Sequence, residues 1–155
     1  MSCLSFPTTV GNTPIEIIEG DAPVLFEKKE LLCDSGGAGK FRGGCGQRIK
    51  FTLLEGEIEP DVPVVASIKG GKLDHPAEGV LGGKPSPLTR LKINDKPLRT
   101  SRQHFLKPGD IFEYEVSGGG GYGNPRERSR GQILEDLRNG LVSGQKARDD
   151  YGADI

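Results

Sequence analysis

The sequence predicts a mainly β protein, a β-sandwich or open-barrel-like domain that ends in two short helices. Short apolar, β-branched and aromatic runs alternate with turn signals, and the pattern becomes helical only after a run of four glycines. The 24 glycines and 11 prolines among 155 residues favour loops over long elements. This length suits one domain. We divide it into a flexible N-terminal segment (1–12), a β-rich part (13–124) and a helical tail (125–155).

The expected strands rest on alternation or on continuous apolar runs. In segment 48–54 the residues Ile49, Phe51 and Leu53 alternate with polar ones, and segment 111–116 alternates in the same way, as half-buried strands do. The other segments expected to be extended are 15–19, 24–32, the apolar run 62–68 (expected to be buried on both faces), and a hairpin of 88–93 and 96–100 around Asn94-Asp95.

Capping signals place two helices after the glycine run. The first is expected to begin at Ser129, which forms a capping box with Gln132, and to end before Gly140. The second is expected between Ser143 and Gly152. Three apolar residues of the first helix share one face: Ile133, Leu134 and Leu137. Because this stripe needs a cover, we expect another subunit to supply it.

Charge and composition exclude several classes of protein. The 21 basic and 22 acidic residues are interspersed, and no basic stripe or set of interleaved aromatic residues favours nucleic-acid binding. The first ten residues lack the charge and apolar core of a signal peptide, and no apolar run is long enough to span a membrane. A cytoplasmic, soluble protein is therefore expected.

The cysteines and histidines do not form a metal motif. Cys3, Cys33 and Cys45 make no CxxC pair, and we interpret them as unpaired thiols in a reducing compartment. His75 and His104 stand far apart and lack the spacing of metal ligands. Whether Cys33, Cys45 or a histidine joins a metal site in three dimensions is left open.

The glycine-rich loops invite a phosphate-binding interpretation that their spacing does not support. Three Gly-Lys pairs lack the following hydroxyl and the upstream glycine of a P-loop. They stand at 39–40, 71–72 and 83–84. Gly118, Gly120 and Gly123 match GxGxxG, but Asn124-Pro125 delays the helix and no βαβ unit follows. We expect these glycines to allow positive φ angles or the close approach of another backbone.

No residue of the sequence can be assigned to catalysis. Ser35 lacks the GxSxG pattern of a nucleophile elbow, and a turn is the simpler interpretation. Lys40 and Arg42 flank the same loop. We interpret them either as solvated charges, the commoner case, or as residues that contact an anion or a partner's carboxylate. Without an acid–base pair, a metal set or an activated nucleophile, the isolated chain is not expected to be an enzyme.

Six motifs bracketed by glycine follow one another in a fixed order. They are NTPIEIIE (12–19), DSGGAGKFRGG (34–44), LGGKP (81–85), LKPGD (106–110), GGGGYGNP (118–125) and GLVSGQKARDDYG (140–152). Together they resemble the C-terminal region of the hydantoinase B family, the B-type subunits of ATP-dependent hydantoinases, oxoprolinases and ketone carboxylases. The segment HPAEG (75–79) departs from the apolar, often Pro-Pro-Trp-Gly-like stretch of that family, and the loop before it looks shortened.

The resemblance implies a role inside a complex. The large N-terminal body of such a subunit has no counterpart here, and the chain looks most like the small subunit of an acetophenone carboxylase. That likeness implies hydantoinase-A-type and truncated B-type large subunits as partners in a hetero-oligomer. It also implies a complex that uses ATP, a divalent metal ion and bicarbonate without biotin, and Met1, the only methionine, leaves no Met-Lys-Met biotinylation site. A hydantoinase- or oxoprolinase-type amidohydrolase and an independent ligand-binding module are the alternatives.

Glycines beside charged residues mark the loops that are candidates for an interface or a site, because they allow a partner's backbone to come close. The candidate residues are Asp34, Ser35, Gly36, Gly37, Lys40, Arg42, Gly82, Gly83, Lys84, Gly119, Gly120 and Tyr122. No cofactor is assigned to this chain itself.

Overall fold

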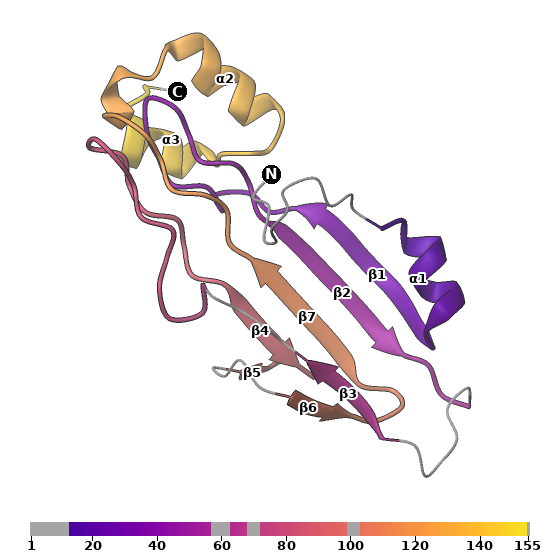
Figure 1. The fold of residues 1–155 in the computed structure, drawn as a ribbon. Coiled ribbons are helices and arrows are strands. Elements are labelled where there is room, and N and C mark those ends of the chain that lie inside the picture. The colour runs from indigo at the N-terminus through magenta and orange to yellow at the C-terminus, as the bar shows by residue number, and fades with distance from the viewer. Residues whose placement is uncertain (1–12, 57–62, 68–71, 99–102, 155) are drawn as a thin grey trace.

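The protein is elongated, with β-sheets at one end and two C-terminal helices at the other (Figure 1). The computed structural model describes residues 13–56, 63–67, 72–98 and 103–154. A five-stranded antiparallel sheet has the order β1-β2-β7-β4-β5, and a second sheet pairs β3 with β6. The strands are β1 (Val24–Leu31), β2 (Gln47–Leu53), β3 (Val64–Ser67), β4 (Arg90–Ile93), β5 (Lys96–Leu98), β6 (Gln103–Leu106) and β7 (Ile111–Val116). The prediction of a mainly β domain followed by helices is confirmed.

Aromatic side chains form the core of the five-stranded sheet. Phe51 of β2 lies opposite Phe112 of β7, and their ring centroids are 5.0 Å apart. Phe26 of β1 extends the row, with its centroid 5.6 Å from that of Phe51. Leu91 of β4 is buried in the same cluster, and Ala66 of β3 packs against it, so the two-stranded sheet covers part of this face. The predicted alternation therefore identified the core-facing side of β2 and β7 correctly.

The hairpin of β4 and β5 turns where the sequence predicts. Asn94 and Asp95 have φ angles of 49° and 62°, the left-handed pair that a type I′ turn requires. The amide oxygen of Asn94 also accepts a hydrogen bond from the Ile111 backbone N–H at 2.8 Å, which ties the turn to β7. Residues 99 and 100 of the predicted hairpin lie outside the described residues.

One predicted strand is instead a helix. Segment 15–19 belongs to α1 (Ile15–Asp21), which begins after Pro14 and lies beside β1. Glu16 occupies the first turn, where its charge suits the helix dipole. Glu19 accepts a hydrogen bond from the Phe26 backbone N–H at 2.7 Å. The β-branched residues of this segment favour a strand, but this local preference is weak. Tertiary contacts to β1 outweigh it, and the segment forms a helix.

The predicted burial of the apolar run 62–68 is also wrong in its described part. β3 pairs only with β6, and its residues alternate between half-buried and exposed. Val65 keeps 39% of its surface exposed. A strand of a two-stranded sheet has only one covered face, so a continuous apolar run did not mean burial on both sides.

The C-terminal helices follow the predicted caps closely. α2 (Arg130–Arg138) begins after Ser129, whose hydroxyl accepts the Gln132 N–H, and α3 (Gly144–Tyr151) is capped by Ser143 in the same way. A short 3₁₀ helix, η1 (Pro125–Glu127), precedes them. Gly140 and Gly152 take the expected left-handed conformation, with φ angles of 65° and 68°.

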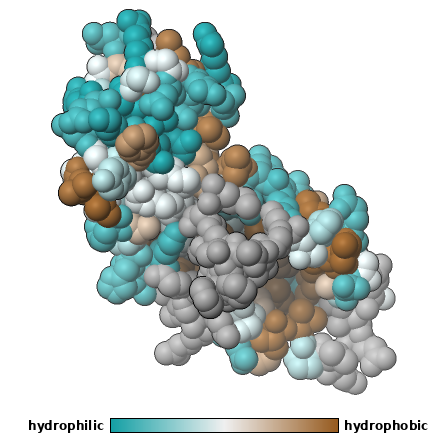
Figure 2. Space-filling model, turned by 45° about the horizontal axis from the view of Figure 1, so that its top comes forward, coloured by the Kyte–Doolittle hydropathy of each residue, from teal (hydrophilic) through white to brown (hydrophobic). Residues whose placement is uncertain are grey.

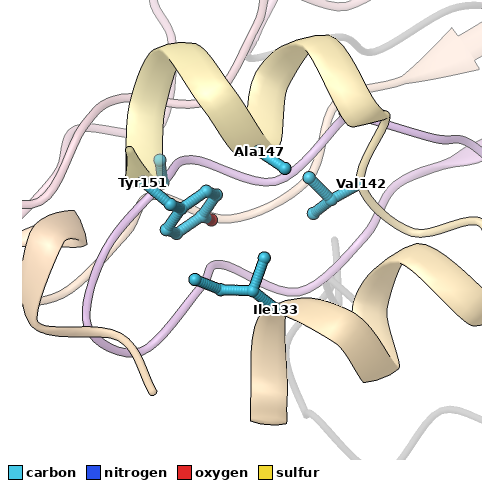
Figure 3. Packing of buried hydrophobic residues seen from close by; sticks show 5 residues of the cluster. Ile133, Val142, Ala147 and Tyr151 are labelled. Atoms are coloured by element: carbon cyan, nitrogen blue, oxygen red, sulfur yellow. The ribbon is translucent and has the colours of Figure 1, made fainter. Parts of the chain in front are cut away.

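The chain itself supplies part of the cover that the sequence analysis expected another subunit to give to α2. Ile133 of α2 is buried against Val142, Ala147 and Tyr151 (Figure 3). Leu137 is partly buried against the same cluster. Ala38, which lies about a hundred residues earlier in the glycine-rich loop, completes this cluster. The chain itself therefore buries Ile133 and partly covers Leu137, because α3 and that loop fold back onto α2.

Candidate functional site

Three glycine-rich segments run side by side between the sheet and the helices, and we call them the glycine bundle (residues 35–46, 77–86 and 117–123). The last segment is hydrogen-bonded to both others. The Gly118 N–H donates to the Ser35 carbonyl, and the Gly121 N–H donates to the Lys84 carbonyl, each at 2.9 Å. Backbone hydrogen bonds thus hold together loops that the sequence shows only as irregular.

The bundle requires glycine because its backbones touch. A β-carbon added at Gly120 would overlap the carbonyl of Glu78, and one added at Gly83 would overlap the carbonyl of Gly121. At Gly119, by contrast, the nearest such atom would be 3.6 Å away. Other glycines with the same constraint are Gly36, Gly37, Gly39, Gly43, Gly46, Gly79, Gly118 and Gly121. For Gly118 and Gly120 of the GxGxxG run the close-approach interpretation is confirmed, and Gly123 takes the positive φ angle that was the other expectation, at 72°.

Asp34 and Ser35 hold the start of the bundle in place. The Asp34 carboxylate accepts the Ser143 N–H at 2.8 Å, and Asp34 itself has a φ angle of 58°. The Ser35 hydroxyl is buried, donates to the Leu32 carbonyl and accepts the Gly46 N–H at 2.8 Å. Ser35 is therefore a turn residue, as predicted, and its oxygen is engaged with the backbone.

Arg42 is a buried structural residue, which the sequence analysis did not foresee. Its guanidinium makes two hydrogen bonds of 3.2 Å to the Asp136 carboxylate and donates to the Cys45 sulfur at 3.0 Å. Arg128 binds the same carboxylate at 2.7 Å, and all three charged side chains are at least 86% buried. One carboxylate of α2 thus joins two arginines, so the interpretation of Arg42 as a solvated loop charge is wrong, and its role at an interface stays a prediction.

The two candidate lysines lie on the surface in ion pairs. Lys40 is 3.3 Å from Glu127 and about half exposed. Lys84 is half exposed and lies 2.6 Å from the mostly buried Asp150 of α3. Lys84 therefore links the second segment of the bundle to the last helix, whereas the exposed Lys40 pair contributes at most about 1 kcal/mol.

A cleft of about 590 Å³ lies beside the bundle, between the polar face of the sheet and α3. On the sheet side, Arg48 lies 2.6 Å from Glu115, which lies 3.7 Å from the exposed Arg90. The hydrogen bond with Glu115 raises the pKa of Arg48. The helix side contributes Gln145, Lys146, Asp149 and Asp150, and the loop side contributes Cys33, Asp34 and Ser35. Side chains of both charges line these walls, and no group of three metal-ligating residues occurs among the described residues.

Cys33 opens onto this cleft as an unactivated thiol. Burial, followed by the charge of the adjacent Asp34, raises the pKa of Cys33. We expect its alkylation by iodoacetamide, followed by peptide mass spectrometry, to have a pH midpoint above that of a free cysteine peptide (about 8.5), because only the thiolate reacts. Asp34→Asn removes the charge and tolerates the positive φ, so it should lower the midpoint. A midpoint below that of the peptide would mean an activated nucleophile.

Gly82 and Tyr122, the last of the predicted candidates, lie at the outer end of the bundle. Tyr122 is 48% exposed, and its backbone pairs with that of Phe41. Gly82 has a φ angle of 87°. The structure thus gathers all twelve candidates in or beside one bundle, where Gly36, Gly37, Gly83 and Gly120 have packing roles. No described helix has the length and hydrophobicity to cross a bilayer.

Residues 2–125 match the Hydantoinase B/oxoprolinase family, and the chain belongs to that family. The resemblance inferred from the six motifs is therefore confirmed.

Individual relatives extend over nearly the whole chain. The caprolactamase subunit beta of Pseudomonas jessenii is 36% identical over 91% of this chain, which covers 25% of that protein. The crystal structure of the ATP-dependent caprolactamase from that organism superposes with a TM-score of 0.73 and 32% identity, over 92% of this chain and 25% of the other. The acetone carboxylase alpha subunit of Xanthobacter autotrophicus is 25% identical over 89% of this chain and 22% of its own length. The chain thus spans about a quarter of the length of each of these relatives.

Proposed function

We propose that this chain is a non-catalytic part of a multi-subunit, ATP-dependent enzyme of the hydantoinase type. One observation carries the proposal: relatives match more than nine-tenths of this chain, yet the chain covers only a quarter of caprolactamase subunit beta. A hydantoinase-B-type body corresponding to the other three quarters would complete it, and we propose that a separate large subunit supplies that body, together with a hydantoinase-A-type subunit. The glycine bundle would contribute a rigid platform to this assembly.

For the reaction we propose two candidates. The sequence motifs point to an acetophenone-carboxylase-like ketone carboxylase, which would use ATP, bicarbonate and a divalent metal ion without biotin. ATP-dependent opening of a cyclic amide is the second candidate, and the higher identity to the caprolactamase subunit (36% against 25% for the acetone carboxylase subunit) favours it. The cytoplasm, where ATP is abundant, would be the compartment of either enzyme.

The test is the native mass of the protein, purified from its own host through a mild affinity tag. We expect co-elution with large chains, one of them of the B type by peptide mass spectrometry. Hydrolysis of ATP that depends on a lactam or a hydantoin would then identify an amidohydrolase, and bicarbonate-dependent consumption of a ketone would identify a carboxylase. A lone species at the 16.6 kDa of this chain would instead support the independent ligand-binding module.

A further inference from the structure

Four exposed apolar side chains meet at the outer end of the glycine bundle, and we call them the tip patch: Phe41, Val80, Leu81 and Tyr122. Their exposed fractions run from 48% for Tyr122 to 72% for Leu81. The rings of Phe41 and Tyr122 are 6.1 Å apart. Hydrophobic atoms gather at the left edge of the upper lobe in Figure 2, the side on which Figure 1 draws the turn around residue 80. An apolar group of this kind, surrounded by hydrophilic surface, is typical of a contact site.

The backbone holds this patch in one arrangement. Phe41 and Tyr122 exchange hydrogen bonds between their N–H and carbonyl groups at 3.0 and 2.9 Å. Val80 donates to the Gly121 carbonyl and accepts from the Gly123 N–H, each at 2.9 Å. The three loops that carry the patch are thus joined by the bundle, so little conformational freedom would be lost when a partner binds.

Leu81 is held in a conformation that its side chain disfavours. The turn of residues 80–83 is closed by a hydrogen bond from Gly83 N–H to the Val80 carbonyl at 3.0 Å. Leu81 and Gly82 have φ angles of 51° and 87°, the two positive values of a type I′ turn. Asn-Gly is the preferred pair in such a turn, whereas a leucine there brings its Cβ too close to the following carbonyl.

In the part of the chain that the structure describes, Leu81 gains little from burial that would offset this strain. Leu81 is the most exposed of the large apolar residues in the described part of the chain. Strain of this kind persists where the site serves another purpose. A side chain projected on a rigid turn is well suited to insert into an apolar pocket of a partner, as binding hot spots do.

We propose that the tip patch is the surface on which this chain docks onto the B-type large body, with Leu81 inserted into an apolar pocket of that body. The inference rests on the proposed function. The B-type body is the occupant because only a quarter of caprolactamase subunit beta corresponds to this chain. The remaining part of that protein is about three times as long as the part that this chain matches. Within the described residues, the four side chains of the tip patch are 48–72% exposed, so they are accessible to that additional part.

The test uses the tagged full chain purified from its own host, with mass spectrometry of the co-purified B-type chain. Leu81→Asn should lower recovery of that chain at least tenfold, and Phe41→Ser should act in the same direction. Because Asn-Gly suits the turn, Leu81→Asn should also keep or raise the urea midpoint of the isolated protein. Phe105→Asn is the matched control, since Phe105 of β6 is 71% exposed but lies at the other end of the molecule, and it should leave recovery unchanged.

The outcomes separate the two proposals. If the parent chain recovers no B-type chain, the proposed function is wrong, and the docking surface is wrong with it. If the parent and Leu81→Asn recover it equally, the docking surface is wrong and the proposed function stands. A parent that forms a dimer of itself, which Leu81→Asn converts to a monomer, would assign the patch to contacts between copies and would also overturn the inference.

Discussion

Gly120→Ala is expected to destabilise the protein by at least about 3 kcal/mol, a large share of the stability of an ordinary domain. The added methyl group would overlap the carbonyl of Glu78, and it would also lie 2.9 Å from the carbonyl oxygen of Ala77. Both obstacles belong to the backbone of the neighbouring segment, so no side-chain rotation can relieve the overlap. Urea unfolding followed by circular dichroism measures the change.

The adjacent glycine provides the control for this substitution. At Gly119 an added β-carbon would have its nearest neighbour 3.6 Å away, an ordinary van der Waals contact. Gly119→Ala should therefore change the free energy of unfolding by less than about 1 kcal/mol. The two glycines are adjacent in a run of four and differ in the room for a β-carbon. Equal changes in the free energy of unfolding would therefore contradict the packing role of the bundle.

Asp136→Asn is expected to cost about 3–5 kcal/mol, because it leaves two buried arginines without a counter-charge. Arg42 and Arg128 both bind this carboxylate, and Arg128 Nε is buried without a hydrogen-bond partner among the described residues. The amide keeps the size of the side chain, so the loss would come from charge and not from a cavity. The free energy of unfolding in urea, compared with that of the parent chain, measures it.

An exposed ion pair next to this cluster provides the comparison. Glu127→Gln breaks only the pair with Lys40, whose two side chains are about half exposed, and should change stability by no more than about 1 kcal/mol. If Asp136→Asn were as mild as Glu127→Gln, the buried cluster would not hold the tail on the bundle. Arg42→Ala is for the same reason an unsuitable test of an interface, since any loss of assembly would follow from unfolding.

Sequence reasoning succeeded where the cause of the structure is local. The hairpin at Asn94 and Asp95 and the caps Ser129 and Ser143 were predicted correctly, because turn and cap chemistry depends on residues within four positions of each other. It failed for α1, where Pro14 and the contacts to β1 outweighed a β-branched composition.

Sequence reasoning did not find the buried ion pair of Arg42 and Asp136 or the unusual conformation of Leu81. Arg42 and Asp136 are 94 positions apart, and nothing in either neighbourhood marks them as partners. Leu81 looked like an ordinary residue before two glycines, and only its φ angle and exposure single it out. One local signal was available: a leucine directly before Gly-Gly is an unusual choice for a tight turn.

The sequence by itself determined the alternating strands, the helix caps, the family and the loops in which glycine is concentrated. Those properties depend on near neighbours or on glycine's missing Cβ, which the sequence displays directly. Only the tertiary structure decided which backbones fill the space beside Gly83 and Gly120, which arginines Asp136 neutralises, and that Ala38 and α3 cover α2. These contacts join residues that are far apart in the sequence. They depend on how distant segments pack, which the pattern of residues along the chain does not show.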